Sequence, residues 1–152
     1  MEKQRLWFLP FLGLLLFPFF SQSAFAQKAK AIKAVKAVLV KQAADWNDGN
    51  IDAFMESYWK SDKLQFIGAS GVTYGWQKTL EGYKKRYPNR QAMGQLHFDI
   101  INVDKHSRKL ISLVGKFTLK REIGNLSGHF LLLFKKIKGK WLIIADHTSA
   151  ET

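Results

Sequence analysis

Cysteine is absent from the 152 residues of this chain. Its absence excludes a disulfide-stapled fold, a zinc site built from thiolates and a lipoprotein anchored through cysteine. Proline is also scarce, and two of the three prolines, Pro10 and Pro18, fall within the first 20 residues. The chain is too short for a two-domain enzyme and suits one domain with a single hydrophobic core.

Acidic residues are half as frequent as basic ones, 12 against 24, and the formal net charge is +12. An excess of this kind is typical of proteins that bind nucleic acids. Here the basic residues are dispersed over a predicted helix, the run Lys84–Arg86 and two turns, and no recognition motif accompanies them. We therefore predict no nucleic-acid partner, and instead a weak contact between a cationic surface and anionic components of the cell envelope.

The first 26 residues have the composition of an export signal. Lys3 and Arg5 precede the apolar run 6–20, and the segment closes with Ala24-Phe25-Ala26. This pattern predicts a cleaved signal peptide at 1–26, a single mature domain at 27–152, and a periplasmic or secreted location. An uncleaved anchor is the alternative, although the two prolines interrupt a run shorter than the roughly 20 residues of a spanning helix.

Hydrophobic periodicity divides the rest of the chain into two halves. Apolar residues spaced by three and four, with lysines between them, predict an amphipathic helix at 28–46. Asn47–Asn50 ends it, Asp52 opens a short second helix, and a third helix at 76–87 stops before Pro88. Short strands are predicted at 64–67 and 72–74. After Pro88 the period becomes two, which predicts strands at 91–103, 110–121, 126–137 and 140–149. Helices followed by a sheet indicate an α+β fold.

The predicted turns set a register that sorts the side chains onto two faces. A two-residue turn at Lys138-Gly139 pairs Phe130 with His147. One face then collects an apolar set that the helices should cover: Leu96, Phe98, Ile100, Ile111, Leu113, Phe117, Leu119, Phe130, Leu132, Phe134, Trp141 and Ile143. In this register His147, Arg121 and Ser149 join that face, and no acidic residue does.

The opposite face mixes polar residues, among them His97, Asp99, Asp146 and Thr148, with several leucines. Such a mixture predicts a homodimer through the outer sheet face, or else isolated surface leucines. The histidines do not share one face and show no metal-binding spacing, so we predict neither a metal nor another cofactor.

Three segments, 44–55, 58–62 and 139–149, carry a family resemblance in their order and residues: A-D-W-N-D-G-N-I-D-A-F-M, Y-W-K-S-D and G-K-W-L-I-I-A-D-H-T-S. Through them residues 30–149 resemble the nuclear transport factor 2-like superfamily, most closely its SnoaL-like, domain-of-unknown-function branch. The resemblance implies a cone-shaped, cystatin-like roll, in which a curved antiparallel sheet wraps around the N-terminal helices and leaves a pocket. It implies that this pocket is lined by Trp46, Tyr58, Trp59, Phe66, Tyr74 and His147.

The leading hypothesis is an exported protein that binds a small, largely apolar molecule with a polar or anionic end. Phe117 and Phe130 would add to the aromatic walls, and His147, Ser149 and Arg121 would orient the ligand. One alternative is an isomerase, cyclase or dehydratase that uses His147. In ketosteroid-isomerase-like relatives the base is a carboxylate, but its position falls on Phe66–Gly68 here, and none of these residues can carry a proton. Another is an oligomeric association module, because Gly139–Ser149 also resembles the end of the calcium/calmodulin-dependent kinase II association domain.

Overall fold

Six strands and four helices make up the computed structural model of the chain, which describes residues 19–150, with side chains from Ala24 onward. In chain order the elements are α1 (Phe19–Asn47), α2 (Ile51–Met55), β1 (Gln65–Gly68), β2 (Gly71–Tyr74), α3 (Trp76–Arg86), α4 (Arg90–Met93), β3 (Gln95–Lys105), β4 (Leu110–Lys120), β5 (Leu126–Ile137) and β6 (Lys140–Ala150).

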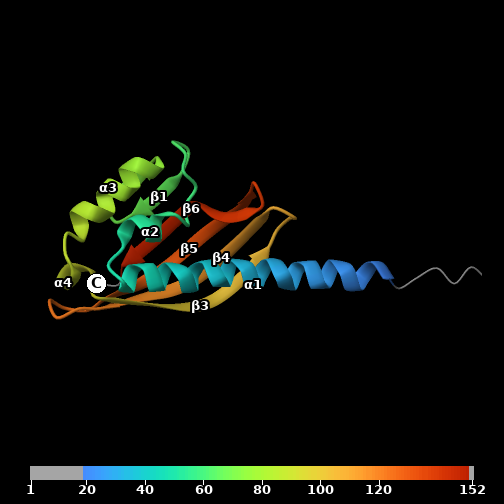
Figure 1. Cartoon of the computed structure of the whole chain (residues 1–152), viewed down its shortest axis with the longest axis horizontal. Helices are drawn as coiled ribbons and strands as arrows, with labels where there is room; N and C mark the ends of the chain where they lie inside the picture. The colour runs from blue at the N-terminus through green and yellow to red at the C-terminus, as the bar shows by residue number, and fades with distance from the viewer. Residues whose placement is uncertain (1–18, 151–152) are drawn as a thin grey trace, which may run out of the picture.

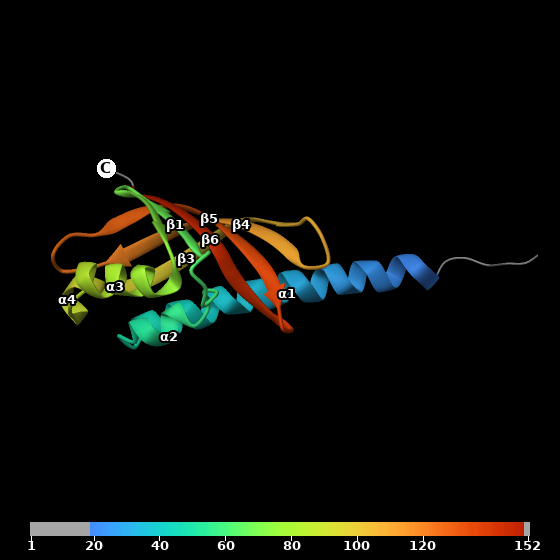
Figure 2. The same cartoon turned by 90° about the horizontal axis from the view of Figure 1, so that it is seen from above.

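The strands form one sheet in the order β2-β1-β6-β5-β4-β3. Neighbouring strands are antiparallel except for β1 and β6, which run parallel. The sheet curves, and the helices lie on its concave side (Figures 1 and 2). This arrangement confirms the predicted α+β roll, with helices that cover one face of a mostly antiparallel sheet.

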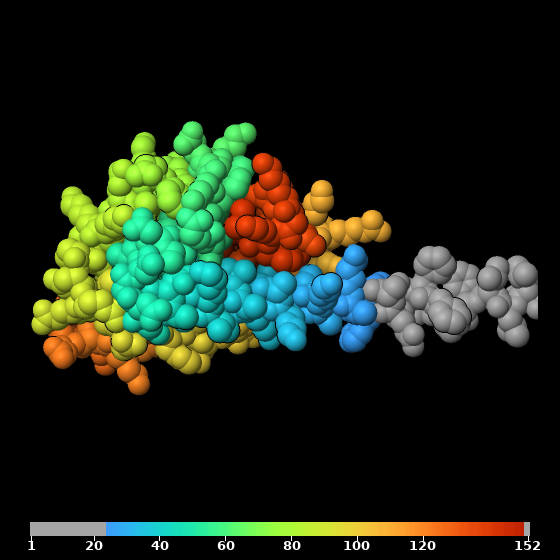
Figure 3. Space-filling view, in the orientation of Figure 1, coloured from blue at the N-terminus to red at the C-terminus, as the bar shows by residue number. Residues whose placement is uncertain are grey.

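Helix α1 has two different halves. From Val35 onward it buries Val35, Leu39, Gln42 and Trp46 at helical spacing against the sheet, whereas residues 24–30 are all exposed. The described part of the helix starts at Phe19, well before the predicted start at Lys28, and its first turns extend beyond the sheet (Figure 1). From Ala24 onward the helix projects from the side of the molecule in the space-filling view (Figure 3). The expected processing site before Gln27 falls within it, and residues 1–18 of the predicted leader lie outside the described residues. No helix of the described part combines the length and the hydropathy needed to cross a membrane.

The C-terminal end of α1 is tied to the segment after Pro88. Arg90 donates to the carbonyl oxygens of Trp46 and Asn47 at 3.0 and 2.6 Å, and the Trp46 carbonyl also accepts from the Gly49 amide at 2.8 Å. These contacts satisfy the last carbonyls of the helix, which have no amide partners within it. Asn47 both accepts from and donates to the backbone of Leu96, at 2.7 and 3.0 Å. The prediction that a strand begins at Gln91 is wrong, because Asn89 caps the short helix α4 and the strand starts at Gln95.

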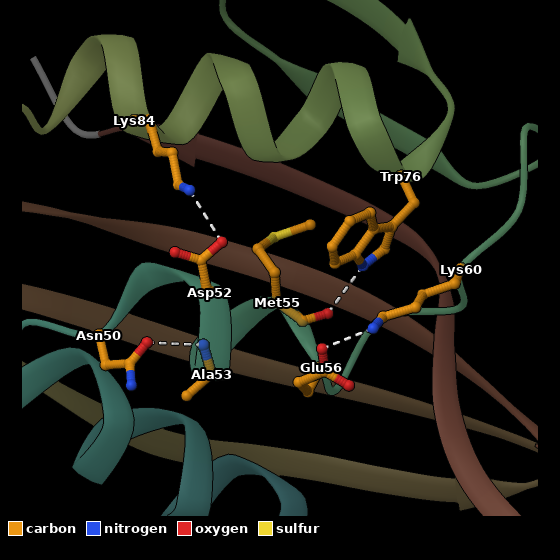
Figure 4. A network of polar contacts seen from close by, with 8 residues as sticks. All are labelled: Asn50, Asp52, Ala53, Met55, Glu56, Lys60, Trp76 and Lys84. Atoms are coloured by element: carbon orange, nitrogen blue, oxygen red, sulfur yellow. Dashed lines mark hydrogen bonds and ion pairs between the residues drawn. The ribbon is translucent and has the colours of Figure 1, made fainter.

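Polar contacts around α2 hold it against α3 (Figure 4). Asn50 caps α2 by accepting from the Ala53 amide, and Lys84 on α3 pairs with Asp52 at 2.8 Å. At the other end of α3, the Trp76 indole donates to the Met55 carbonyl at 2.9 Å, with the Lys60 ammonium 4.9 Å above its ring. The two helices are therefore tied together at both ends on the concave side of the sheet.

The concave face of the sheet carries the predicted apolar set. Phe98 and Ile100 are half-buried there, and the other ten members are buried. The β5–β6 turn is the predicted two-residue loop, because Lys138 and Gly139 both have positive φ and Ile137 pairs with Lys140. Turns at 104–109 and 122–125 predict that Phe98 pairs with Gly115 and that Phe117 pairs with Phe130. The structure instead pairs Phe117 with Phe98 and Gly128, a shift of two residues that keeps the side chains on their faces. A bulge at Ile101 adds one residue to β3, so the register beyond it shifts once more and Val103 lies opposite Leu113.

A β-bulge overturns the prediction for the end of β6. Phe134 pairs with Ile143 as predicted, but Leu133 pairs with Ala145, so Ile144 is an extra residue in β6. One extra residue reverses the alternation of faces beyond it. Asp146 is therefore on the concave face, and His147 pairs with Leu131 on the outer face, where both side chains are exposed. The predictions that His147 lies on the concave face and that no acidic residue does are both wrong.

Candidate functional site

A cavity of about 80 Å³ lies between the helices and the concave face of the sheet. Aromatic and aliphatic side chains form most of its walls, and it contains one acidic residue, Asp146, and one basic residue, Arg86. The lining residues are Gln42, Trp46, Phe54, Tyr58, Phe66, Tyr83, Arg86, Tyr87, Leu96, Phe98, Phe117, Leu119, Phe130, Leu132, Asp146 and Thr148. A concave apolar site with a few polar groups is the usual form of a small-molecule site.

Tyr83 of α3 is the centre of the aromatic wall. Its ring is 5.3 Å from that of Phe54, 5.6 Å from Phe66 and 6.1 Å from Trp46, in edge-to-face arrangements. On the sheet side, the ring of Phe98 meets that of Phe130 at 5.3 Å. Rings that contact one another edge to face restrict each other's rotation, so the wall is preformed.

The backbone around Tyr58 extends the sheet and fixes this side chain. Ile143 of β6 donates to the Ser57 carbonyl and accepts from the Trp59 amide, both at 2.9 Å. Tyr58 is thereby held beside β6, and its hydroxyl donates to Asp146 Oδ2 at 2.7 Å. Thr148 donates to Asp146 Oδ1 at 2.7 Å. Both carboxylate oxygens of a buried acid thus have a hydroxyl donor.

The low polarity of the cavity changes the protonation of these groups. Burial raises the pKa of Asp146 above its ordinary value of 3.8, although the hydrogen bonds from Thr148 and Tyr58 act in the opposite direction. Burial, together with the negative charge of Asp146, also raises the pKa values of Tyr58 and Tyr83. Both phenols therefore remain protonated donors at neutral pH, beside a carboxyl group that binds a proton more readily than an exposed aspartate does.

Arg86 is the last residue of α3 and lines the cavity although it is exposed, so it lies at the opening. A smaller cavity of about 30 Å³ adjoins the first one and shares Phe66, Tyr83 and Arg86 with it. The two charged residues of the site thus occupy different positions, one buried on β6 and one at the opening.

The structure brings together only half of the residues predicted to bind a ligand. Those that line the cavity are Trp46, Tyr58, Phe66, Phe117 and Phe130, and those that do not are Trp59, Tyr74, Arg121, His147 and Ser149. His147 and Ser149 are exposed beyond the bulge, and Ser149 donates to the His129 carbonyl at 3.4 Å. Tyr74 is exposed on the edge strand β2, and Trp59 is half-buried outside the cavity. Arg121 donates to the Gly124 carbonyl at 2.8 Å, outside the cavity.

Several cavity residues were not predicted from the sequence. Tyr83 and Tyr87 follow Leu80 at helical spacing, and this pattern could have identified them. Gln42 also falls on the buried stripe of α1, where its side-chain amide donates to the Phe54 carbonyl at 3.4 Å. Asp146 carries no such signal, because a bulge at Ile144 cannot be located from the alternation alone.

Two other features of the described residues do not form a site. A surface hollow of about 630 Å³ surrounds Arg90 and Asn89, but its polar groups are already engaged in the α1 cap, the α4 cap and the pair between Lys84 and Asp52. Within residues 24–150, no three His, Asp or Glu side chains lie close enough together to hold a metal ion. The cavity around Asp146 is therefore the candidate site.

Comparisons with known proteins agree with the fold. No protein-family model and no curated protein matches the sequence. Solved structures do match. An NTF-2-like protein of unknown function from Shewanella oneidensis MR-1 has 35% sequence identity and a TM-score of 0.76, over 78% of this chain and 98% of that one.

Two more distant structures share the fold. A ketosteroid isomerase-like protein from Erwinia carotovora atroseptica has 15% identity and a TM-score of 0.65, over 79% of this chain and 95% of that one. A protein of unknown function with a cystatin-like fold from Nostoc punctiforme has 10% identity and a TM-score of 0.60, over 78% and 89%. On the identity and coverage shared with the Shewanella protein, this chain belongs to the nuclear transport factor 2-like family.

Proposed function

We propose that the cavity binds a small, largely apolar molecule and that Asp146 and Tyr58 fix its polar end. The observation that carries this proposal is a buried carboxyl group, held by two hydroxyl donors, in an otherwise aromatic and aliphatic cavity. Burial of a carboxylate among apolar side chains costs free energy. Such groups are enriched at functional sites, where that cost is offset by what the group does for a ligand.

The size and polarity of the cavity restrict the ligand. About 80 Å³ is well below the roughly 300–1,000 Å³ of sites for drug-sized molecules, so a single ring or a short chain is the matching size. A carboxylate accepts hydrogen bonds and repels anions, so the end of the ligand at Asp146 should carry a hydroxyl or an amine. The anionic end that the sequence led us to expect does not fit beside Asp146.

The first test is native mass spectrometry of the protein expressed from its full sequence. It should detect a small molecule that copurifies with the protein. As a defined ligand, benzyl alcohol should quench the fluorescence of Trp46 in the cavity wall. Asp146→Asn should weaken this binding about tenfold, since a hydrogen bond to a charged group contributes about 1.5–3 kcal/mol. The matched control is His147→Asn, the neighbouring residue on the outer face, which should leave binding unchanged. The proposal would be refuted if no molecule copurified and if neither substitution changed the affinity for benzyl alcohol.

A second candidate function is acid–base catalysis, in which Asp146 moves a proton on the bound molecule, as in an isomerase or a dehydratase. The raised pKa of a carboxyl group inside the cavity supports it, because a general base works best when its pKa approaches the working pH. His147, exposed on the outer face, is not in a position to serve this reaction. Turnover should increase as the pH rises through the pKa of Asp146 and should be lost in Asp146→Asn, whereas a flat pH profile would exclude Asp146 as the base.

The location and the assembly follow from the sequence pattern and remain proposals. We propose that the protein is exported by its N-terminal segment, that it forms homodimers through the outer sheet face and that its basic surface contacts anionic envelope components. Leu131, about half exposed on that face, supports the dimer. Lys28, Lys30, Lys33 and Lys36, all outside the core along α1, support the envelope contact, which should weaken with salt in a vesicle-binding assay.

A further inference from the structure

Among the described residues, Arg86 differs from Arg90 and Arg121 in having no hydrogen-bond or ion-pair partner. Arg90 donates to two backbone carbonyls, and Arg121 donates to a third. Within residues 24–150, no carboxylate or hydrogen-bond acceptor pairs with Arg86, although it lines the opening of the cavity. A guanidinium group presents N–H donors in a planar fork that matches a carboxylate. The structure therefore leaves an unused carboxylate-binding group at the opening.

The two charged residues of the cavity have opposite signs and different surroundings. Asp146 is 3% exposed, whereas Arg86 is open to solvent. The Tyr83 hydroxyl is close enough to both to respond to each charge, since Asp146 raises its pKa and Arg86 lowers it. A molecule in the cavity thus meets an acceptor at its inner end and a cation at its outer end, with aromatic rings along its sides.

Building on the proposed binding function, we propose that Arg86 binds a carboxylate of the ligand at the cavity opening and selects for small apolar carboxylates. The apolar body of the ligand lies along the aromatic wall that Phe66 and Tyr83 help to form, and its far end faces Asp146. A neutral molecule of the same shape makes the apolar contacts but leaves the Arg86 fork without a partner. Arg86 therefore determines specificity, and the aromatic walls contribute the common part of the affinity.

A simpler role for Arg86 is stabilisation of α3, because a cation in the last turn of a helix interacts favourably with the helix dipole. Lys84 and Lys85 occupy the same turn. Lys84 already pairs with Asp52, whereas Lys85 is exposed and does not line the cavity. Lys85→Gln therefore removes the same charge from the same helix end without touching the opening, and serves as the matched control.

The test compares benzoate with benzamide, its neutral counterpart of nearly the same shape, by calorimetric titration of the full chain. The wild-type protein should prefer benzoate by about tenfold, the value of one charge-assisted interaction. Arg86→Gln should abolish this preference while leaving benzamide affinity unchanged. Arg86→Lys should retain part of it, because the charge remains without the fork. Lys85→Gln should keep the full preference, and all three variants should keep the wild-type melting temperature.

The possible failures are distinguishable. If benzamide and benzoate bind the wild type equally, the role of Arg86 is wrong and the proposed binding function stands. The role of Arg86 is also wrong if Lys85→Gln reduces the preference as much as Arg86→Gln, since a general charge effect then explains it. If neither compound binds but benzyl alcohol does, only the role of Arg86 is wrong. If benzyl alcohol also fails to bind, both the proposed function and the role of Arg86 fail.

Discussion

The two faces of the sheet differ in burial, although neighbouring residues of the same strands form both of them. On the concave face, apolar side chains and Asp146 close around a cavity. On the outer face, His97 and Asp99 form an exposed pair at 3.1 Å, and Leu131 is 46% exposed. Asp146 and His147 are adjacent in the chain, yet one is buried in the site and the other faces outward. Which of the two enters the cavity is decided by a single extra residue, Ile144.

The two faces differ in how strongly a carboxylate interacts with its surroundings. Asp99 is surrounded by water, which screens its charge, so its pair with His97 contributes little. Asp146 lies in a low-dielectric environment, where each hydrogen bond and each charge has a larger effect. Changes on the concave face should therefore alter stability and binding, and equivalent changes on the outer face should alter neither.

The largest effect is expected from truncating adjacent leucines of β5. Leu132 faces inward and is 4% exposed, whereas Leu131 faces outward at 46%. Leu132→Ala should lower the free energy of unfolding by roughly 2–5 kcal/mol, because it leaves a cavity in the core. Leu131→Ala should cost less than about 1 kcal/mol. Urea denaturation of both variants measures the difference, and similar losses would contradict the assignment of the faces.

A smaller loss is expected from Gly115→Ala on β4. A Cβ atom at Gly115 would lie 2.4 Å from Phe130 Cζ and 2.9 Å from the Asp99 carbonyl oxygen. Phe130 would have to move into the cavity, at a cost of roughly 1–3 kcal/mol, with weaker ligand binding. Gly82→Ala is the control, because that exposed helical glycine has no atom within 4 Å of the added carbon. It should stabilise the protein by about 0.5–1 kcal/mol.

The pH dependence of stability distinguishes Asp146 from His147. Because the folded state raises the pKa of Asp146, the contribution of this group is fully present below 3.8 and is lost as the pH rises through the folded-state pKa. As the pH rises through this range, the wild type should therefore lose unfolding free energy relative to Asp146→Asn, which has no group to titrate at this position.

His147→Asn keeps the buried carboxyl group of Asp146, so the unfolding free energy of this variant should still fall as the pH rises, as it does in the wild type. Chemical denaturation at a series of pH values measures both curves. Parallel curves for the wild type and Asp146→Asn would show that Asp146 titrates normally.

The smallest effect on stability, but a clear one on assembly, is expected from Leu131→Lys. The exposed side chain should change the free energy of unfolding by no more than about 0.5 kcal/mol. If the outer faces pair, the lysine places a charge at the interface, and sedimentation velocity should show a shift from dimer to monomer at micromolar concentration. A wild-type protein that is already monomeric there would exclude the proposed dimer.

Much of the fold was accessible from residue patterns. The helical first half and the stranded second half of the chain, the Lys138-Gly139 turn and the apolar set on one sheet face all follow from local chemistry, and the structure confirms them. Patterns of this kind survive register errors of two residues, because the alternation has a period of two. The short helix α4 was missed, since four residues after an asparagine cap carry too little periodicity to be distinguished from the start of a strand.

The candidate site was accessible only in part. Five of the residues that line the cavity were predicted. Trp46, Tyr58 and Phe66 came from the family resemblance, and Phe117 and Phe130 came from the predicted inner face of the sheet. The polar residues of the site were assigned to the wrong side chains, because their faces depend on the bulge at Ile144 and on the packing of α3.

The sequence by itself determined most of the order of the elements and the inner apolar face, since these rest on local propensity and on the separation of apolar from polar residues. The family came separately, from the resemblance carried by segments 44–55, 58–62 and 139–149. The tertiary structure alone decided which charged groups share the cavity. Asp146 enters it through a bulge in β6, and Arg86 reaches its opening from the end of α3. Both placements depend on how distant segments pack against one another, and no local pattern records that packing.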